Sequence, residues 1–166
     1  MLSRRRKNMP YLTPPTTLNA RDLAAVQAQL AQARLPFEDL LPTSMPLFLG
    51  VRDSDSGLSR DVTQPGPLIA FAGLESHGVE GLLRSLWVRP DHRGRGLART
   101  LLHAHESQAR QLGLNRLVLL TESAADFFQA LGYRETDRTA LSAQLRASTQ
   151  FQQLCPASAH CLSKTL

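Results

Sequence analysis

Cysteine is scarce in this chain of 166 residues, and long apolar runs are missing. Cys155 and Cys161 are too few for a disulfide framework, and their spacing is not that of a zinc site. The apolar runs fall far short of the ~20 residues that a membrane-spanning helix needs. The basic first residues lead into no apolar signal-peptide core. These absences predict a cytoplasmic protein with no membrane partner.

A basic domain face is also missing, although the formal net charge is +5. Arg4, Arg5, Arg6 and Lys7 supply four of the five units, so 15 basic residues oppose 14 acidic ones in the remainder. We therefore expect residues 1–9 to form a disordered basic tail, and we expect no nucleic-acid partner. Residues 10–166 are enough for a single domain with one core.

Two familiar phosphate-binding fingerprints are absent. No Gly-Lys-Ser or Gly-Lys-Thr occurs, which excludes a P-loop. Gly94 and Gly96 are followed by Ala98 and Arg99, which leaves the dinucleotide pattern Gly-x-Gly-x-x-Gly incomplete.

The sequence does contain a glycine-rich turn between an expected strand and an expected helix. Residues 82–88 form an apolar run typical of a buried strand, and from Leu97 apolar residues recur at helical spacing. Glycine lets the backbone approach a ligand, and the free amides at a helix start favour an anion. A tight connection without a ligand is the alternative, but the arrangement favours a diphosphate on the amides of residues 93–98.

This turn resembles the acetyl-CoA loop of the GNAT acyltransferases, whose pattern is Gln/Arg-x-x-Gly-x-Gly/Ala. The matching residues are Leu86-x-Val88-x-Pro90-x-x-Arg93-Gly94-x-Gly96-Leu97-Ala98. About thirty residues later, Ala124-x-x-Phe127-Phe128-x-x-Leu131-Gly132-Tyr133 resembles the second cofactor motif of the family. The resemblance covers residues 19–166. The tail, from Gly132 through Arg138 to Ala159, is similar to the arsenic-resistance N-acetyltransferases.

The expected fold class is α/β (α+β), with a GNAT-like mixed, mostly antiparallel sheet flanked by helices. The resemblance adds a splay between two parallel strands. The patterns predict helices over 20–34, 97–112 and 124–131, with Asn19 and Asp22 capping the first. They predict strands over 47–52, 68–74, 80–88, 117–120, 133–137 and 159–164, and a short edge strand over 11–13. A loop is expected over 53–66.

The resemblance implies acetyl-CoA as co-substrate. The backbone amide of Leu86 would polarise the thioester carbonyl, and the backbone of Val88 would bind the pantetheine arm. The cofactor-binding residues are then Trp87, Val88, Arg93, Gly94, Arg95, Gly96, Leu97, Ala98, Phe127 and Phe128.

Two residues depart from the family pattern. Phe128 stands where many members have a tyrosine that protonates the leaving sulfur, so that role is excluded. Leu82 stands where some relatives have a glutamate base. Glu80, Glu75 or Glu38 could act as a base through water, and Glu80 is the candidate we carry forward. Direct proton loss to solvent is the alternative.

The acceptor site is expected beside the segment after the first helix. Glu38 or Asp39 could hold a substrate ammonium, unless these acids begin a second helix. Arg84 is a charge on an apolar strand. Simple alternation places it on the face of Leu86 and Val88, where it could receive an oxyanion; the alternative is an ion pair with Glu75 or Glu80.

No metal is expected, because no histidine has a ligand-like partner four residues on. Cys155 could meet arsenic, although a small buried thiol is the more ordinary interpretation.

The resulting hypothesis is an N-acetyltransferase that moves an acetyl group from acetyl-CoA to a primary amine of a small molecule. The tail resemblance suggests an amino-acid-like organoarsenical as acceptor, and hence arsenic resistance. The alternatives are another amino acid, an antibiotic amine or a protein terminus as acceptor, or a non-catalytic acetyl-CoA sensor. Either a monomer or a homodimer is compatible with the sequence.

Overall fold

The structure is a computed structural model that describes residues 14–53 and 65–166. Within these ranges it contains a seven-stranded sheet in the order β1-β2-β3-β4-β5-β7-β6. Only β4 and β5 are parallel neighbours; every other pair of neighbours is antiparallel. The strands are β1 (Thr16–Thr17), β2 (Leu47–Arg52), β3 (Leu68–His77), β4 (Glu80–Val88), β5 (Arg116–Thr121), β6 (Arg134–Glu135) and β7 (His160–Thr165).

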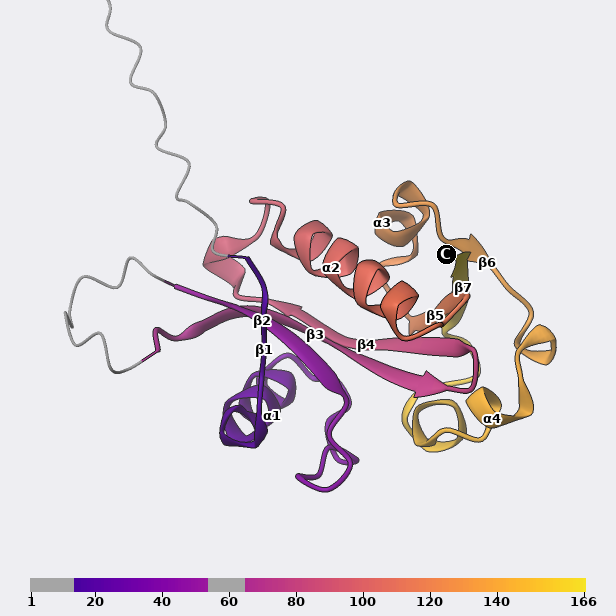
Figure 1. Ribbon diagram of the computed structural model, residues 1–166, viewed down its shortest axis with the longest axis horizontal. Helices are drawn as coiled ribbons and strands as arrows, with labels where there is room; N and C mark the ends of the chain where they lie inside the picture. The colour runs from indigo at the N-terminus through magenta and orange to yellow at the C-terminus, as the bar shows by residue number, and fades with distance from the viewer. Residues whose placement is uncertain (1–13, 54–64) are drawn as a thin grey trace, which may run out of the picture.

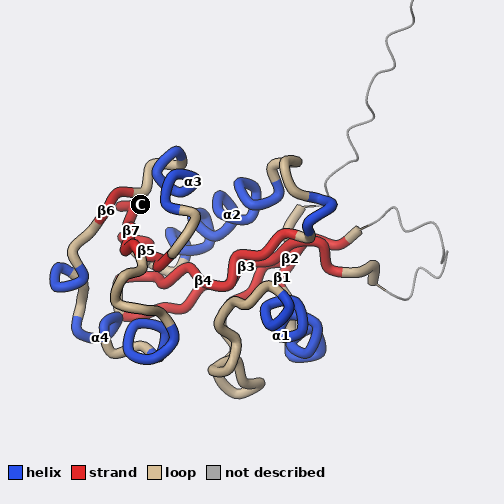
Figure 2. Tube along the Cα trace, turned by 180° about the vertical axis from the view of Figure 1, so that it is seen from behind, coloured by secondary structure: helices blue, strands red, loops and turns tan. Residues whose placement is uncertain are grey.

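Four α-helices in the described ranges cover the two faces of this sheet. The helices are α1 (Leu23–Gln32), α2 (Leu97–Gln111), α3 (Ala125–Ala130) and α4 (Ala143–Arg146). In Figure 1, α2 and α3 lie on one face, and α1 and α4 lie on the other. Figure 2 shows the same layers from behind. The predicted mixed, mostly antiparallel sheet flanked by helices is therefore confirmed.

The first helix begins and ends at residues that its sequence specifies. The Asn19 side chain accepts a hydrogen bond from the Arg21 amide, and the Asp22 side chain accepts one from the Asn19 amide. Together these bonds form the predicted reciprocal cap. A 3₁₀ turn over Ala20–Asp22 precedes α1, which buries Leu23 and other apolar residues of one stripe. Arg34 then adopts φ of 55°, and the Leu35 amide bonds back to the helix.

Several predicted boundaries are corrected by the structure. The acids that follow Pro36 lie in turns, so the alternative of a second helix there is wrong. The strand expected over 133–137 shrinks to β6, because fully buried Tyr133 packs in the core beneath α2. The edge strand expected over 11–13, the basic tail and most of the 53–66 loop lie outside the described residues.

A β-bulge in β4 changes which side chains share a face. Phe71 lies opposite Trp87 and Gly73 lies opposite Arg84, so β4 carries one more residue than β3 over this interval. Ser85 accommodates the extra residue with φ of 57°. Arg84 therefore bonds to groups on the α1 face, whereas Leu86 packs with the α2 side. The expectation that Arg84 shares a face with Leu86 and Val88 is wrong for this reason.

Candidate active site

The two parallel strands separate and open a cavity. β4 pairs with β5 only from Glu80 to Leu82, opposite Arg116 to Val118. Beyond Leu82 the strands diverge, and a cavity of about 860 Å³ lies along the opening. Its lining comes from residues 33–36, 83–88, 92–94, 96–99, 120–124, 127–128, 150, 154–156 and 159. The chain thus brings together the glycine-rich loop before α2, the bulged strand β4 and the C-terminal segment.

The loop before α2 has the geometry of an anion seat. Gly94 has φ of 73° and Gly96 has φ of 81°, which glycine adopts without steric cost. A Cβ at either position would meet nothing within 4 Å, so the backbone there is open to a ligand. Within the described part of the chain, the amides of residues 94–96 make no hydrogen bond. Free amides at the start of a 15-residue helix suit a diphosphate.

Most predicted cofactor residues line this cavity. The exception is Arg95, whose guanidinium donates to the Asp91 carbonyl at 3.2 Å. Arg93 Nε donates to the Val88 carbonyl at 3.2 Å, which ties the loop to the end of β4. The other lining members of the set are Trp87, Val88, Gly94, Gly96, Leu97, Ala98, Phe127 and Phe128. The residues present therefore fit a CoA-type ligand by shape and by donor chemistry.

The bulge places Leu86 at the opening. The register pairs neither Ser85 nor Leu86 with a residue of β3, and pairing with β5 has ended at Leu82. Both residues line the cavity. The main chain of Leu86 is therefore available to a ligand that enters between the strands.

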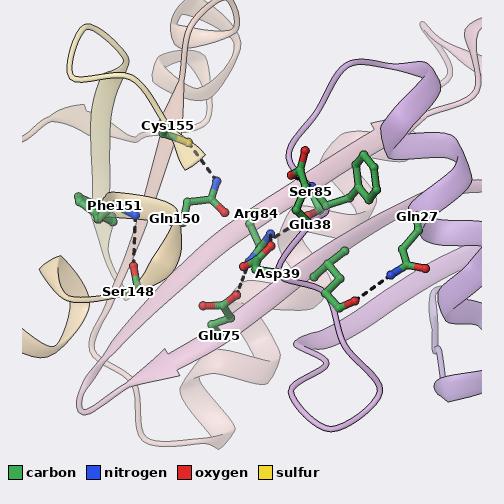
Figure 3. Close-up of polar contacts among 12 residues, drawn as sticks. Gln27, Glu38, Asp39, Glu75, Arg84, Ser85, Ser148, Gln150, Phe151 and Cys155 are labelled. Atoms are coloured by element: carbon green, nitrogen blue, oxygen red, sulfur yellow. Dashed lines mark hydrogen bonds and ion pairs between the residues drawn. The ribbon is translucent and has the colours of Figure 1, made fainter. Parts of the chain in front are cut away.

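Arg84 lies at the centre of a buried ion-pair cluster. Its side chain is 1% exposed. Its two terminal nitrogens bind both oxygens of Asp39, and Nη1 also donates to Glu75 at 2.6 Å. Figure 3 shows these carboxylates flanking the guanidinium. The predicted pair with Glu75 is present, while Asp39, expected to hold a substrate, instead binds Arg84.

The donors of Arg84 are not all used. Nε donates to Ser85 Oγ at 3.3 Å, and the Nη2 contact to Asp39 uses one of that nitrogen's two hydrogens. One N–H of Arg84 is thus left without a partner among the described residues, beside the weakly engaged Nε–H. Burial raises the pKa of Glu75, but hydrogen bonds from His77 and Arg84 outweigh burial and lower that pKa overall.

Two other predicted acids lie outside the cavity lining. Glu80 is 3% exposed, pairs with Arg116 and accepts the Ser142 amide at 3.0 Å. Burial opposes ionisation of Glu80, but these partners lower its pKa overall. Glu38 is exposed, and backbone amides, chiefly that of Phe37, lower its pKa. The position of Glu80 does not support it as a base.

The second motif supplies aromatic packing. Phe128 is 6% exposed, and its ring lies 5.8 Å from the Tyr133 ring in an edge-on arrangement. Phe127 is partly exposed at the cavity. Neither side chain has an ionisable group, so these two residues contribute shape and stability rather than acid–base chemistry.

Three polar residues stand out among the cavity residues that sequence reasoning missed. Gln150 opens a π-helical turn, Gln150–Leu154, which gives no periodicity signal. Glu122 follows β5 and is exposed in the lining. Arg34 also lines the cavity, and its backbone has the left-handed conformation, which the sequence Ala-Arg-Leu-Pro does not predict.

Comparison with known proteins agrees with this geometry. Residues 60–135 match the family model described as acetyltransferase (GNAT) domain. Amino-acid acetyltransferase from Pseudomonas putida strain GB-1 is 37% identical over 91 residues, which are 50% of this chain and 21% of that protein. The enzyme of that name from Mannheimia succiniciproducens is 30% identical over 94 residues, 55% of this chain and 21% of its own. The chain thus spans about a fifth of the length of these curated relatives.

Solved structures share the fold. N-acetylglutamate synthase from Neisseria gonorrhoeae, in complex with coenzyme A and L-arginine, superposes with a TM-score of 0.73 and 18% identity. The match covers 92% of this chain and 32% of the synthase. Rv2747 from Mycobacterium tuberculosis, solved with CoA, gives a TM-score of 0.69 and 19% identity over 92% of this chain and 99% of its own.

The open glycine loop, the splayed parallel strands and the family match agree with one another. Residues 60–135 match the GNAT acetyltransferase domain model, and the described residues have the GNAT fold. The predicted GNAT fold is confirmed. Among the described residues, no helix is long and apolar enough to span a membrane.

Proposed function

We propose that this chain is an acetyl-CoA-dependent N-acetyltransferase whose acceptor is the amino group of a small amino acid. The observation that carries the proposal is one continuous cavity, which joins the open amides before α2 to the splay between β4 and β5. The amino-acid acetyltransferases and the N-acetylglutamate synthase that it resembles support both the reaction and the acceptor class.

In this proposal the main chain holds the cofactor. Acetyl-CoA, when bound, supplies an acetyl group activated as a thioester. The amides of residues 94–98 receive the diphosphate, and the backbone of Val88 binds the pantetheine arm. The Leu86 amide donates to the thioester carbonyl, where negative charge develops during attack. Donors fixed in the backbone need no rearrangement at the moment of reaction, which favours the transition state.

The acceptor amine must lose a proton before or during attack. Glu122 is the carboxylate among the described lining residues, and its exposed place beyond β5 would let it take this proton through water. It replaces Glu80 in the proposal, because Glu80 is held by Arg116 and Ser142. Proton loss to solvent remains compatible with the cavity.

Arg84 is still proposed to bind the carboxylate of the acceptor, but only through the edge of its guanidinium that Asp39 and Glu75 do not occupy. Asp39 and Glu75 hold one side of the guanidinium, so they fix its orientation. The remaining Nη2–H and the adjacent Nε–H lie on one edge, and this edge matches a carboxylate. The exposed Glu38 nearby would favour a positively charged amino group at the entrance.

The similarity of the tail to arsenic-resistance N-acetyltransferases keeps an amino-acid-like organoarsenical in the set of candidate acceptors. Such a compound carries the same amino and carboxylate groups as an amino acid. Cys155 lines the cavity and is half-buried, and burial raises the pKa of its thiol, which keeps it protonated. A protonated thiol is a poor ligand for trivalent arsenic, so the amino-acid part of the molecule would govern recognition.

The test is release of free thiol from acetyl-CoA with a panel of acceptors. The panel contains amino acids, their carboxamides, simple amines, an amino-acid-like organoarsenical and a peptide with a free amino terminus. We expect turnover with one or more free amino acids and weaker turnover with the matching carboxamides. Tight acetyl-CoA binding without turnover of any acceptor would support the sensor alternative, and light scattering of the same sample would distinguish monomer from homodimer.

A further inference from the structure

Gln150 presents an unusual polar group to the cavity. The residue is 6% exposed and lines the cavity from the start of the π-helical turn. Its Nε2 donates to Cys155 Sγ at 3.3 Å. Its Oε1 is buried and has no hydrogen-bond partner in the described part of the chain. A buried carbonyl without a donor is costly, so a group that supplies a donor there gains free energy.

The position of this oxygen is informative. The other buried side-chain atom without a partner among the described residues is His105 Nδ1, which belongs to a fully buried side chain on α2. Gln150 instead lies at the wall of a cavity. In Figure 3 its amide nitrogen turns toward Cys155, and its oxygen turns away, on the side where Arg84 lies. Gln150 and Arg84, with its partly unused guanidinium, both line this cavity.

The C-terminal segment holds Gln150 in this place. The Cys155 amide bonds to the Gln150 carbonyl at 3.1 Å and closes the π-helical turn. Arg138 donates to the carbonyls of Pro156 and Ala159 at 3.1 and 3.0 Å, and its guanidinium lies 5.6 Å from the centre of the Phe151 ring. The turn is thus closed at Cys155 and held by Arg138 on the C-terminal side of Gln150, which restricts where this side chain can lie.

We infer that Gln150 is a positioning residue whose amide oxygen accepts an N–H of the acceptor amine while Arg84 holds the carboxylate of the same molecule. The inference rests on the proposed function and narrows it to α-amino acids, which carry both groups on one carbon. A neutral oxygen suits this task. A carboxylate in its place would favour the protonated amine, which cannot attack, whereas an amide orients the N–H with a weaker effect on the amine pKa.

The experiment compares Gln150→Met, Gln150→Glu and the control Gln152→Met. Met has nearly the shape of Gln but no acceptor oxygen, and Glu keeps an oxygen. Gln152 lies in the same turn, is exposed, and uses its Nε2 on the Arg146 carbonyl outside the cavity. For each variant, acceptor KM and kcat, acetyl-CoA Kd and the thermal midpoint are measured with the best amino acid of the panel.

We expect Gln150→Met to raise the acceptor KM about tenfold or more, because a buried hydrogen bond to the amine is lost. Its acetyl-CoA Kd should match that of the wild type, and its thermal midpoint should not fall, because the buried oxygen without a donor is removed. Gln150→Glu should recover most of the KM but lower kcat, because its carboxylate favours the protonated amine. The control should leave all four quantities unchanged. An unaltered KM in Gln150→Met, or a loss that appears equally in Kd and thermal midpoint, would overturn the inference.

Failure of the proposed function would look different. In that case the wild-type chain turns over no amino acid, and the same panel is titrated calorimetrically into the CoA-loaded chain. Binding of an amino acid that Gln150→Met abolishes would support the positioning role without catalysis. Absence of amino-acid binding to the wild-type chain would overturn both proposals.

Discussion

Replacing Arg84 tests the buried ion-pair cluster most directly. Arg84→Met keeps the apolar stem but removes the charge that faces Asp39 and Glu75, whose side chains are 16% and 22% exposed. Removing one partner of a buried pair leaves the others poorly solvated and costs about 3–5 kcal/mol. For a chain of this size, each kcal/mol lowers the thermal midpoint by about 2–4 °C. We therefore expect a decrease of about 6–20 °C at pH 7.

The pH dependence of this deficit identifies its cause. The pKa of Glu75 in the folded wild type lies below its ordinary value of 4.5. Its contribution to stability is therefore present above the unfolded pKa and is lost as the pH falls through the folded one. Without Arg84, burial should instead raise the pKa of Glu75, so protonation at low pH removes the cost of an unpaired buried charge. The stability deficit of Arg84→Met should consequently shrink between pH 7 and pH 4.

Urea unfolding at both pH values measures this difference. Arg134→Met, an exposed arginine on edge strand β6, is the matched control and should change stability little. A deficit that is equal at pH 7 and pH 4, or absent at both, would refute the buried-cluster reasoning. Arg84→Lys extends the test to function, because an ammonium lacks the planar fork. A stably folded Lys variant that still prefers amino acids over their carboxamides would exclude the acceptor role.

The remaining predictions concern the cofactor loop, the second motif and the excluded base. In a calorimetric titration, Gly96→Val should reduce acetyl-CoA affinity far more than Arg93→Ala. A side chain at Gly96 strains a left-handed backbone position and fills the space that faces the ligand. Equal small losses of affinity would contradict binding of the diphosphate by backbone amides. Phe128→Ala should lower the free energy of unfolding by about 3–5 kcal/mol, and selective loss of turnover at normal stability would argue against a packing role. Glu80→Gln should lower stability through its partner Arg116 while kcat and its pH profile stay unchanged, and a lost acidic limb in that profile would restore Glu80 as a base.

Local chemistry made much of the fold predictable. β2 and β4 have the bounds that their apolar runs indicate, and the reciprocal cap of the first helix follows from Asn19 and Asp22. The turn before α2 was equally predictable, since Gly94 and Gly96 precede a helix-period run and glycine adopts positive φ without steric cost. These features depend on residues close together in sequence.

The acceptor side was less predictable because it depends on long-range contacts. The pair between Arg84 and Asp39 joins residues 45 positions apart, and alternation along β4 gave the wrong face for Arg84. The extra residue at Ser85 reverses the alternation of side chains between the two faces of β4, and a serine in the sequence does not predict a bulge.

By itself, the sequence determined the order of most elements, the glycine-rich turn before α2 and the absence of a tyrosine hydroxyl at Phe128. Each depends on backbone preference or on side-chain identity, which the chain carries locally. Only the tertiary structure decided that β4 and β5 separate after Leu82 and that Gln150 reaches the resulting cavity. The physical reason is that a cavity depends on long-range packing: it forms where segments distant in sequence pack without filling the space between them.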